Sequence, residues 1–156
     1  WRHKAYYLLA CVTVAGTTLV CVAIQNISVA PPRLLPELGY VDTALVYGQS
    51  MYGPPGTGIA GQLAAMPSIH VAWAGIIAAF GVAVSTSAWR WLLAAHFVMT
   101  SYVVVATANH WWLDGIVGLG IAGLVFVVAR ALIPPSTGAP ADLGVAAQVD
   151  ERAASA

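Results

Sequence analysis

Two short polar stretches interrupt an otherwise apolar chain, and each of them carries a histidine. Residues 109–114 read Asn-His-Trp-Trp-Leu-Asp, so His110 and Asp114 stand four positions apart. On a helix this spacing places both side chains on one face, about one turn apart. A carboxylate there can accept the proton on one imidazole nitrogen and leave the other nitrogen available as a base or nucleophile. The upstream stretch, residues 66–70 (Met-Pro-Ser-Ile-His), supplies His70 as the expected partner.

The composition indicates that transmembrane helices position these polar residues. Of the 156 residues, 60% are hydrophobic and only 8% are charged, whereas about 25% of a soluble domain is charged. The formal net charge is zero, which offers no basis for a nucleic-acid partner. Ionisable side chains in apolar segments are costly unless they are paired, so the few that occur here are candidates for function.

The hydrophobic pattern predicts an all-α, polytopic transmembrane bundle with about four spans. The apolar segments cover residues 5–28, 69–84, 91–106 and 115–133. The first is uncharged and long enough to cross a ~30 Å hydrocarbon layer. A signal peptide is the alternative for this segment, but its apolar part is too long and Pro31 would follow the cleavage site. The chain opens on Trp1 rather than Met, from which we expect a fragment or processed form that lacks upstream spans.

The expected domain organisation is a membrane-embedded domain followed by a tail. The domain covers residues 1–133, and within it the Pro- and Gly-rich residues 31–66 form an extracytoplasmic loop with one short interfacial helix near 41–51. Residues 134–156 are rich in Pro, Ala, Ser and Gly, which predicts a disordered cytoplasmic tail.

Small and polar residues mark where the helices begin and touch. Pro67 and Ser68 are expected to start the second helix, as first-turn proline or N-cap. The free N–H groups there, together with Ser68, can hold phosphate oxygens. Gly118 and Ala122 are spaced for close helix contact, as is a strip of small residues beginning at Ala72.

Basic residues predict the orientation. With four spans, Arg2, Lys4, Arg90 and Arg130 fall on one side and Arg33 on the other, so the positive-inside rule puts the first group in the cytoplasm. Because two spans separate them, both histidines then share the outer face. We therefore expect an integral protein, of the plasma membrane, with its site on the extracytoplasmic face.

Two histidines and an aspartate leave several chemistries open. Each could be structural: His70 as an interfacial residue bonded to a carbonyl, and His110 with Asp114 as a helix cap. The three could also ligate zinc. In nucleophilic phosphoryl transfer, His110 would attack phosphorus and His70 would protonate the departing oxygen. That chemistry needs the imidazoles about 5–8 Å apart and an Asp114–His110 hydrogen bond of about 2.6–3.2 Å. His96, in mid-span, is expected only to pack or to hydrogen-bond.

The two stretches resemble known motifs. Residues 67–70 are similar to the Pro-Ser-x-His motif, and residues 110–114 to the His-x-x-x-Asp motif, of the type 2 phosphatidic acid phosphatase superfamily. The branch most similar is the inositol phosphorylceramide synthase-like group, in which residues 30–33 (Ala-Pro-Pro-Arg) also have a counterpart. The similarity covers roughly residues 30–129.

The resemblance implies a helical bundle, usually of six spans, with a site that uses no metal and no cofactor. The substrate would be a lipid phosphate or a lipid-linked phosphate. His110 would be the nucleophile that becomes phosphorylated, Asp114 would orient it, and His70 would be the general acid. Beside these roles, the residues themselves suggest Arg33 and Ser68 as substrate contacts, with Asn109 or Thr107 replacing phosphate-binding donors that the chain lacks.

The chain departs from the superfamily pattern at several phosphate-binding positions. Asn26 stands where the first motif has Lys, and Val103 and Val104 stand where the third motif begins Ser-Arg. Ala108 replaces a Gly. Arg33 is then the only basic residue on the expected outer face, with an interface anchor as its alternative role. Fewer charges suggest a less charged substrate, group transfer, or weak activity.

The predicted function is a membrane lipid phosphatase or phosphotransferase working through a phosphohistidine intermediate. Water as acceptor gives hydrolysis, and a lipid or sugar hydroxyl gives transfer. The alternatives are a non-catalytic or proton-relaying membrane protein and a metal-dependent membrane hydrolase. The residues carry no indication of the oligomeric state.

Overall fold

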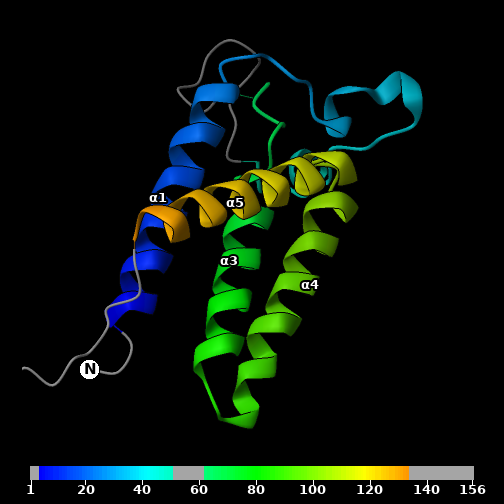
Figure 1. The fold of residues 1–156 in the computed structure, drawn as a ribbon. Helices are drawn as coiled ribbons and strands as arrows, with labels where there is room; N and C mark the ends of the chain where they lie inside the picture. The colour runs from blue at the N-terminus through cyan, green and yellow to red at the C-terminus, as the bar shows by residue number, and fades with distance from the viewer. Residues whose placement is uncertain (1–3, 51–61, 134–156) are drawn as a thin grey trace, which may run out of the picture.

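A computed structural model describes residues 4–50 and 62–133, and in these residues the regular structure is helical (Figure 1). The α-helices are α1 (Lys4–Ile24), α2 (Thr43–Val46), α3 (Ile69–Val84), α4 (Trp91–Ala106) and α5 (Trp112–Leu132). Three short 3-10 helices, η1 (Pro32–Leu34), η2 (Pro36–Leu38) and η3 (Ala88–Arg90), lie in the connections. The predicted all-α fold is confirmed. The expected tail, 134–156, and part of the long loop, 51–61, lie outside the described residues.

Three stretches of the described chain are long and apolar enough to cross a membrane, and they are Tyr6–Ile24, Ala88–Ala106 and Trp112–Leu132. The fourth apolar helix, α3, has 16 residues, which at 1.5 Å per residue is roughly 24 Å. That is shorter than a ~30 Å hydrocarbon layer. The helices are those of a membrane protein, with three helices of full spanning length and one shorter apolar helix, where about four spans were predicted.

Two of the predicted helix ends were wrong. α1 ends at Ile24 rather than Ser28, because the Asn26 side-chain amide donates to the carbonyls of Val22 (3.0 Å) and Ala23 (3.2 Å) and caps the last turn. α5 begins at Trp112, three residues before the expected start at Gly115. By contrast, α3 and α4 begin and end where the apolar pattern predicted them.

The centre of the bundle is α3. It packs against α1, α4 and α5, whereas α4 lies along α3 and touches α5 only slightly. Figure 1 shows α3 and α4 as an antiparallel pair joined by the short connection at the lower end of the view, with α5 beginning near the opposite end. A small buried cluster of Ala72, Ile76 and Ala122 joins α3 to α5.

α5 approaches α3 closely at Gly118. A Cβ atom at this position would lie 2.6 Å from the carbonyl oxygen of Ser68, which is backbone and cannot move aside. The expected close contact at Gly118 is therefore present, and it fixes the start of α5 against the start of α3. A Cβ atom at Gly120, two residues further along α5, would meet no neighbouring atom within 4 Å.

Gly118→Ala should therefore lower the free energy of unfolding by about 1–3 kcal/mol, the usual cost of overpacking a close contact. Gly120→Ala is the matched control and should leave stability equal or slightly higher, because Ala is the better helix former. Thermal unfolding of both variants in the same detergent measures the difference. Equal stabilities for the two would contradict the contact.

Candidate functional site

Backbone hydrogen bonds bring three separate segments together at one end of the bundle. Val29 donates to the carbonyl of Leu63 at 2.6 Å, and Ala65 donates back to the Val29 carbonyl at 3.2 Å. The Ser68 amide donates to the Asp114 carbonyl at 3.0 Å. The segment after α1, the segment before α3 and the start of α5 are thus held against one another. This is the end opposite to the α3–α4 connection in Figure 1.

The two histidines meet at this end. His70 lies in the first turn of α3, and His110 lies two residues before α5. Their ring centroids are 5.9 Å apart and the ring planes are inclined by 57°, a separation inside the range expected from the sequence. His70 is exposed and His110 is buried. A single phosphoryl group entering from the side of His70 could therefore contact both imidazoles.

A backbone carbonyl determines the tautomer of His110. Nδ1 lies 2.7 Å from the carbonyl oxygen of Ala65. Because a carbonyl oxygen can only accept, this bond requires the proton on Nδ1. The second ring nitrogen, Nε2, then keeps its lone pair, which is the state that a nucleophile or base requires.

The expected geometry between His110 and Asp114 was wrong in two respects. Since α5 begins at Trp112, His110 precedes the helix and the two residues share no helical face. The Asp114 Oδ2 atom lies 3.5 Å from His110 Nδ1, longer than the expected hydrogen bond. The same oxygen accepts the Trp111 backbone N–H at 2.8 Å and so caps α5. Asp114, which is almost fully buried, therefore places a carboxylate close to the ring while it holds the helix start.

The surroundings favour neutral His110. Burial lowers the pKa of His110 below its usual value, and the neighbouring His70 lowers it further. The hydrogen bond to Ala65 and the Asp114 carboxylate oppose this and raise the pKa, but burial is the largest effect. Near neutral pH the imidazole is accordingly uncharged.

Arg33 is buried and already has partners. Its Nε–H donates to Asn109 Oδ1 at 3.0 Å, and its Nη1 donates to Asp42 Oδ2 at 3.3 Å. Its backbone N–H donates to the carbonyl of Ala108 at 2.9 Å. Both expected substrate contacts, Arg33 and Asn109, thus belong to one network that ties the segment after α1 to the turn before His110.

Ser68, the third expected substrate contact, is fully buried at the start of α3. Its hydroxyl accepts the Val71 backbone N–H at 3.5 Å, which makes it the N-cap that the sequence predicted. A contact between Ser68 and a phosphate stays a prediction. His96, which was expected to pack, is exposed on α4.

Two contributors to the site were missed, the Ala65 carbonyl and the Asp42 carboxylate. Every residue carries a carbonyl, so no side-chain pattern could have indicated Ala65. Asp42 did leave a signal, because an acidic residue just before a short helix is a typical N-cap, and here its Oδ1 accepts the Leu45 N–H at 3.0 Å.

The turn before His110 contains one strained residue. Ala108 has φ of 54°, in the left-handed region, where a non-glycine residue costs roughly 1–2 kcal/mol. This is the position at which the superfamily pattern has glycine. Ala108 thus stands, in this chain, in a backbone conformation that glycine would adopt without strain.

No metal centre is evident in residues 4–50 and 62–133, where no three His, Cys, Asp or Glu side chains gather in a way that could hold an ion. The alternative of a zinc site made by His70, His110 and Asp114 finds no support in this geometry. The independence of the chemistry from metal stays a prediction.

Comparison with known proteins identifies the family of the chain. The family model described as PAP2 superfamily matches residues 1–128, a range that includes both histidine stretches. No curated protein and no solved structure matches the chain. The superfamily indicated by the two motifs is confirmed, and the inositol phosphorylceramide synthase-like branch stays a prediction.

The lowered pKa of His110 predicts how stability depends on pH. The unfolded imidazole titrates near 6.5, and the folded one below that, so protonation favours the unfolded chain. The contribution of His110 is complete above pH 6.5 and is lost as the pH falls through the folded pKa. As the pH falls through this interval, the free energy of unfolding should decrease more for wild type than for His110→Gln. The control variant His96→Gln should behave as wild type does. Parallel curves for wild type and His110→Gln would contradict a neutral, buried His110.

Proposed function

Because the chain belongs to the PAP2 superfamily, we propose that it is an integral membrane phosphatase or phosphotransferase acting on a lipid-linked phosphate ester. The observation that carries the proposal is the 5.9 Å separation of the His70 and His110 rings at one end of an apolar bundle. A bilayer protein meets its substrate in the membrane, which favours a phosphate borne by a lipid.

In the first step, the lone pair on His110 Nε2 forms a bond to phosphorus while the bond from phosphorus to the ester oxygen breaks. His70, protonated in the substrate complex, gives its proton to the departing alcohol. The exposed position of His70 suits this role, because the leaving group must come and go on the open side. The product of the step is a phosphohistidine at His110.

In the second step, neutral His70 removes a proton from the acceptor, whose oxygen attacks the phosphohistidine. The phosphorus–nitrogen bond breaks and its electron pair returns to Nε2, so both histidines regain their starting states. With a phosphomonoester as substrate, water as acceptor releases inorganic phosphate; with a phosphodiester, the second alcohol stays on phosphorus and water releases a phosphomonoester. A hydroxyl group of a lipid or sugar gives a new phosphate ester. No cofactor or metal takes part in either step.

The neighbouring residues position His110. The Ala65 carbonyl, 2.7 Å from Nδ1, holds the ring and its proton. The Asp114 carboxylate, 3.5 Å from the same nitrogen, stabilises the positive charge that develops on the ring during attack. Arg33 and Asn109 are hydrogen-bonded to each other and hold the turn before His110. Arg33, Asn109 and Ser68 are the proposed substrate contacts.

The proposed location of the site is the extracytoplasmic face of the plasma membrane. Arg90 lies in the connection between α3 and α4, at the end of α3 away from His70, and it interacts with the Trp91 ring at 5.3 Å. Cationic residues with aromatic neighbours are typical of a membrane interface, and basic ones favour the cytoplasmic side.

The charge of the site favours a substrate with low negative charge. Arg33 is paired with Asp42, and the side chains of this pair are 4% and 17% exposed. A phosphate dianion would gain less here than beside two unpaired cations. A phosphodiester or a lipid-linked donor fits better, in keeping with a transferase of the inositol phosphorylceramide synthase-like branch.

A phosphoenzyme trap tests the nucleophile. Brief incubation of the purified protein with ³²P-labelled lipid phosphates and phosphodiesters, followed by denaturation, should leave acid-labile, base-stable label on the wild-type chain. His110→Ala should lose the label because the attacking nitrogen is gone. His96→Ala is the matched control and should keep it, since His96 lies exposed on α4. Labelling of the His110→Ala chain at the wild-type level would refute the mechanism.

Asp114→Asn tests the division of labour between Asp114 and Ala65. In hydrolases where a carboxylate alone fixes the tautomer, this change costs about 10⁴-fold in kcat. Here the Ala65 carbonyl keeps the tautomer, and Asn can still accept the Trp111 N–H, so we expect a loss nearer ~10²-fold from the missing charge. Steady-state kcat measures it. A loss of kcat as large as that of His110→Ala would show that Asp114, and not the Ala65 carbonyl, fixes the tautomer of the His110 ring.

A further inference from the structure

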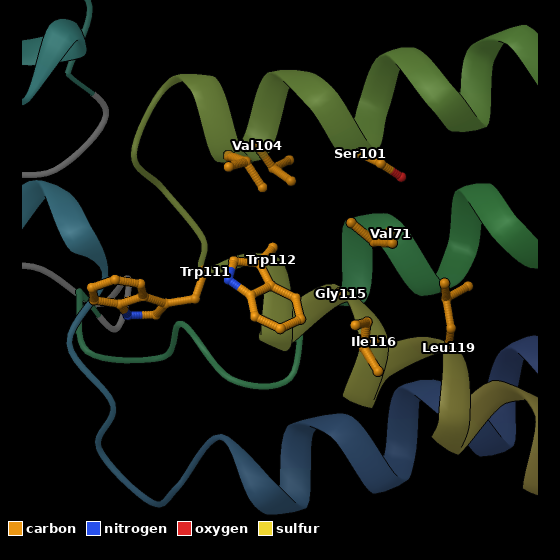
Figure 2. Close-up of a pocket in the computed structure, with 9 residues that line it drawn as sticks. Val71, Ser101, Val104, Trp111, Trp112, Gly115, Ile116 and Leu119 are labelled. Atoms are coloured by element: carbon orange, nitrogen blue, oxygen red, sulfur yellow. The ribbon is translucent and has the colours of Figure 1, made fainter.

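An apolar cavity adjoins the histidine pair. It has a volume of about 160 Å³ and lies where the start of α5 meets α3 and α4. Figure 2 shows Val104 and Ser101 of α4 facing Trp112 and Ile116 of α5, with Val71 of α3 at the side. Trp112 is 66% exposed and Ile116 is 54% exposed. The cavity therefore opens toward the surroundings of the bundle.

Of the polar side-chain groups in the cavity wall, two are already hydrogen-bonded and the third is the indole N–H of Trp112. The Ser101 hydroxyl donates to the carbonyl of Phe97 at 2.8 Å, within its own helix. The Trp111 indole N–H donates to the carbonyl of Ala30 at 3.1 Å, in the segment after α1. Neither group has to meet a ligand, and the remaining lining is hydrocarbon or aromatic. The cavity is therefore suited to an apolar occupant rather than to a headgroup.

The cavity lies beside the proposed catalytic residues, because a sequence neighbour of each of them is part of its lining. Val71 follows His70 on α3, Trp111 follows His110, and Gly115 follows Asp114, and all three line the cavity. The part of a substrate next to a phosphate held between the histidines is thus the part that this cavity could receive. The carbonyl of Val104 also accepts the His110 backbone N–H at 2.9 Å, which ties the α4 wall to the nucleophile.

The α4 wall of the cavity also includes a position at which this chain lacks a charge that the superfamily motif carries. Val103 and Val104 stand where the superfamily motif begins Ser-Arg, and Val104 lines the cavity. A position that would carry a cation for phosphate is here part of a hydrocarbon surface. The chain thus offers apolar contact at a point where the superfamily motif has a cationic side chain.

We propose that this cavity is a binding subsite for the first hydrocarbon segment of the substrate, the carbons next to the phosphate ester. The inference rests on the proposed function and names the part of the substrate that the site selects. An apolar cavity of about 150 Å³ takes a molecule of the size of benzene, so the subsite holds about six carbons. Longer chains continue through the open side into the bilayer.

Water-soluble alkyl phosphates test the subsite in protein reconstituted into lipid nanodiscs. Each fully buried methylene contributes a factor of about four in binding. Even partial burial of the additional methylenes should therefore make kcat/KM at least about tenfold higher for hexyl phosphate than for ethyl phosphate, and the gain should level off beyond about six carbons. Val104→Phe fills the cavity and should reduce the hexyl-to-ethyl ratio by about tenfold. Val98→Phe makes the same change at an exposed position of α4 outside the lining and should keep the ratio within about twofold.

A second variant covers the case in which Val104→Phe does not fold. Val104→Ala removes wall contacts without adding bulk and should reduce the same ratio by about fourfold. Equal kcat/KM for the two esters in wild type, or equal losses in the Val104 and Val98 variants, would overturn the subsite and leave the proposed function standing.

Absence of turnover with every phosphate ester would instead overturn the proposed function. The subsite is then judged by calorimetric binding of hexylphosphonate and ethylphosphonate, which cannot be hydrolysed. Tighter binding of the hexyl compound, lost in Val104→Phe and kept in Val98→Phe, supports the subsite. Equal binding of the two phosphonates by wild type overturns it.

Discussion

The hydrogen bond between His110 Nδ1 and the Ala65 carbonyl, at 2.7 Å, is the contact on which the site depends. It joins the segment before α3 to the segment before α5, and it fixes the proton on the buried ring. A backbone acceptor does not titrate and keeps its place when side chains change. The proposed nucleophile is therefore prepared by the main chain, and the Asp114 carboxylate contributes mainly its charge and its cap on α5.

A second set of contacts makes this arrangement rigid. Arg33 bonds through its backbone to Ala108 and through its side chain to Asn109 and Asp42. Burying such an ion pair costs desolvation that offsets much of the attraction between the charges. Its main structural effect is therefore to hold the turn before His110 in one position. This explains how a strained backbone at Ala108 can persist, since the neighbouring bonds determine the conformation.

Much of the framework could be predicted from the sequence, and the details of the site could not. The bounds of α3 followed from Pro67, Ser68 and an unbroken apolar run, and the close approach at Gly118 followed from residue size. The start of α5 was placed too late, because Asp114 was taken as a ring partner rather than as the cap of a helix that already includes Trp112. Side-chain patterns also carry no information about which carbonyl a ring will meet.

Trp111 connects two parts of the molecule that the chain order keeps far apart. Its indole N–H donates to the Ala30 carbonyl, and its ring packs edge-to-face with that of Tyr40, with the ring centroids 5.5 Å apart. The same residue lines the apolar cavity. The position of this wall is thus tied to the stretch that leaves α1. A substitution where the chain leaves the first helix would therefore reshape the proposed subsite without changing any residue of its lining.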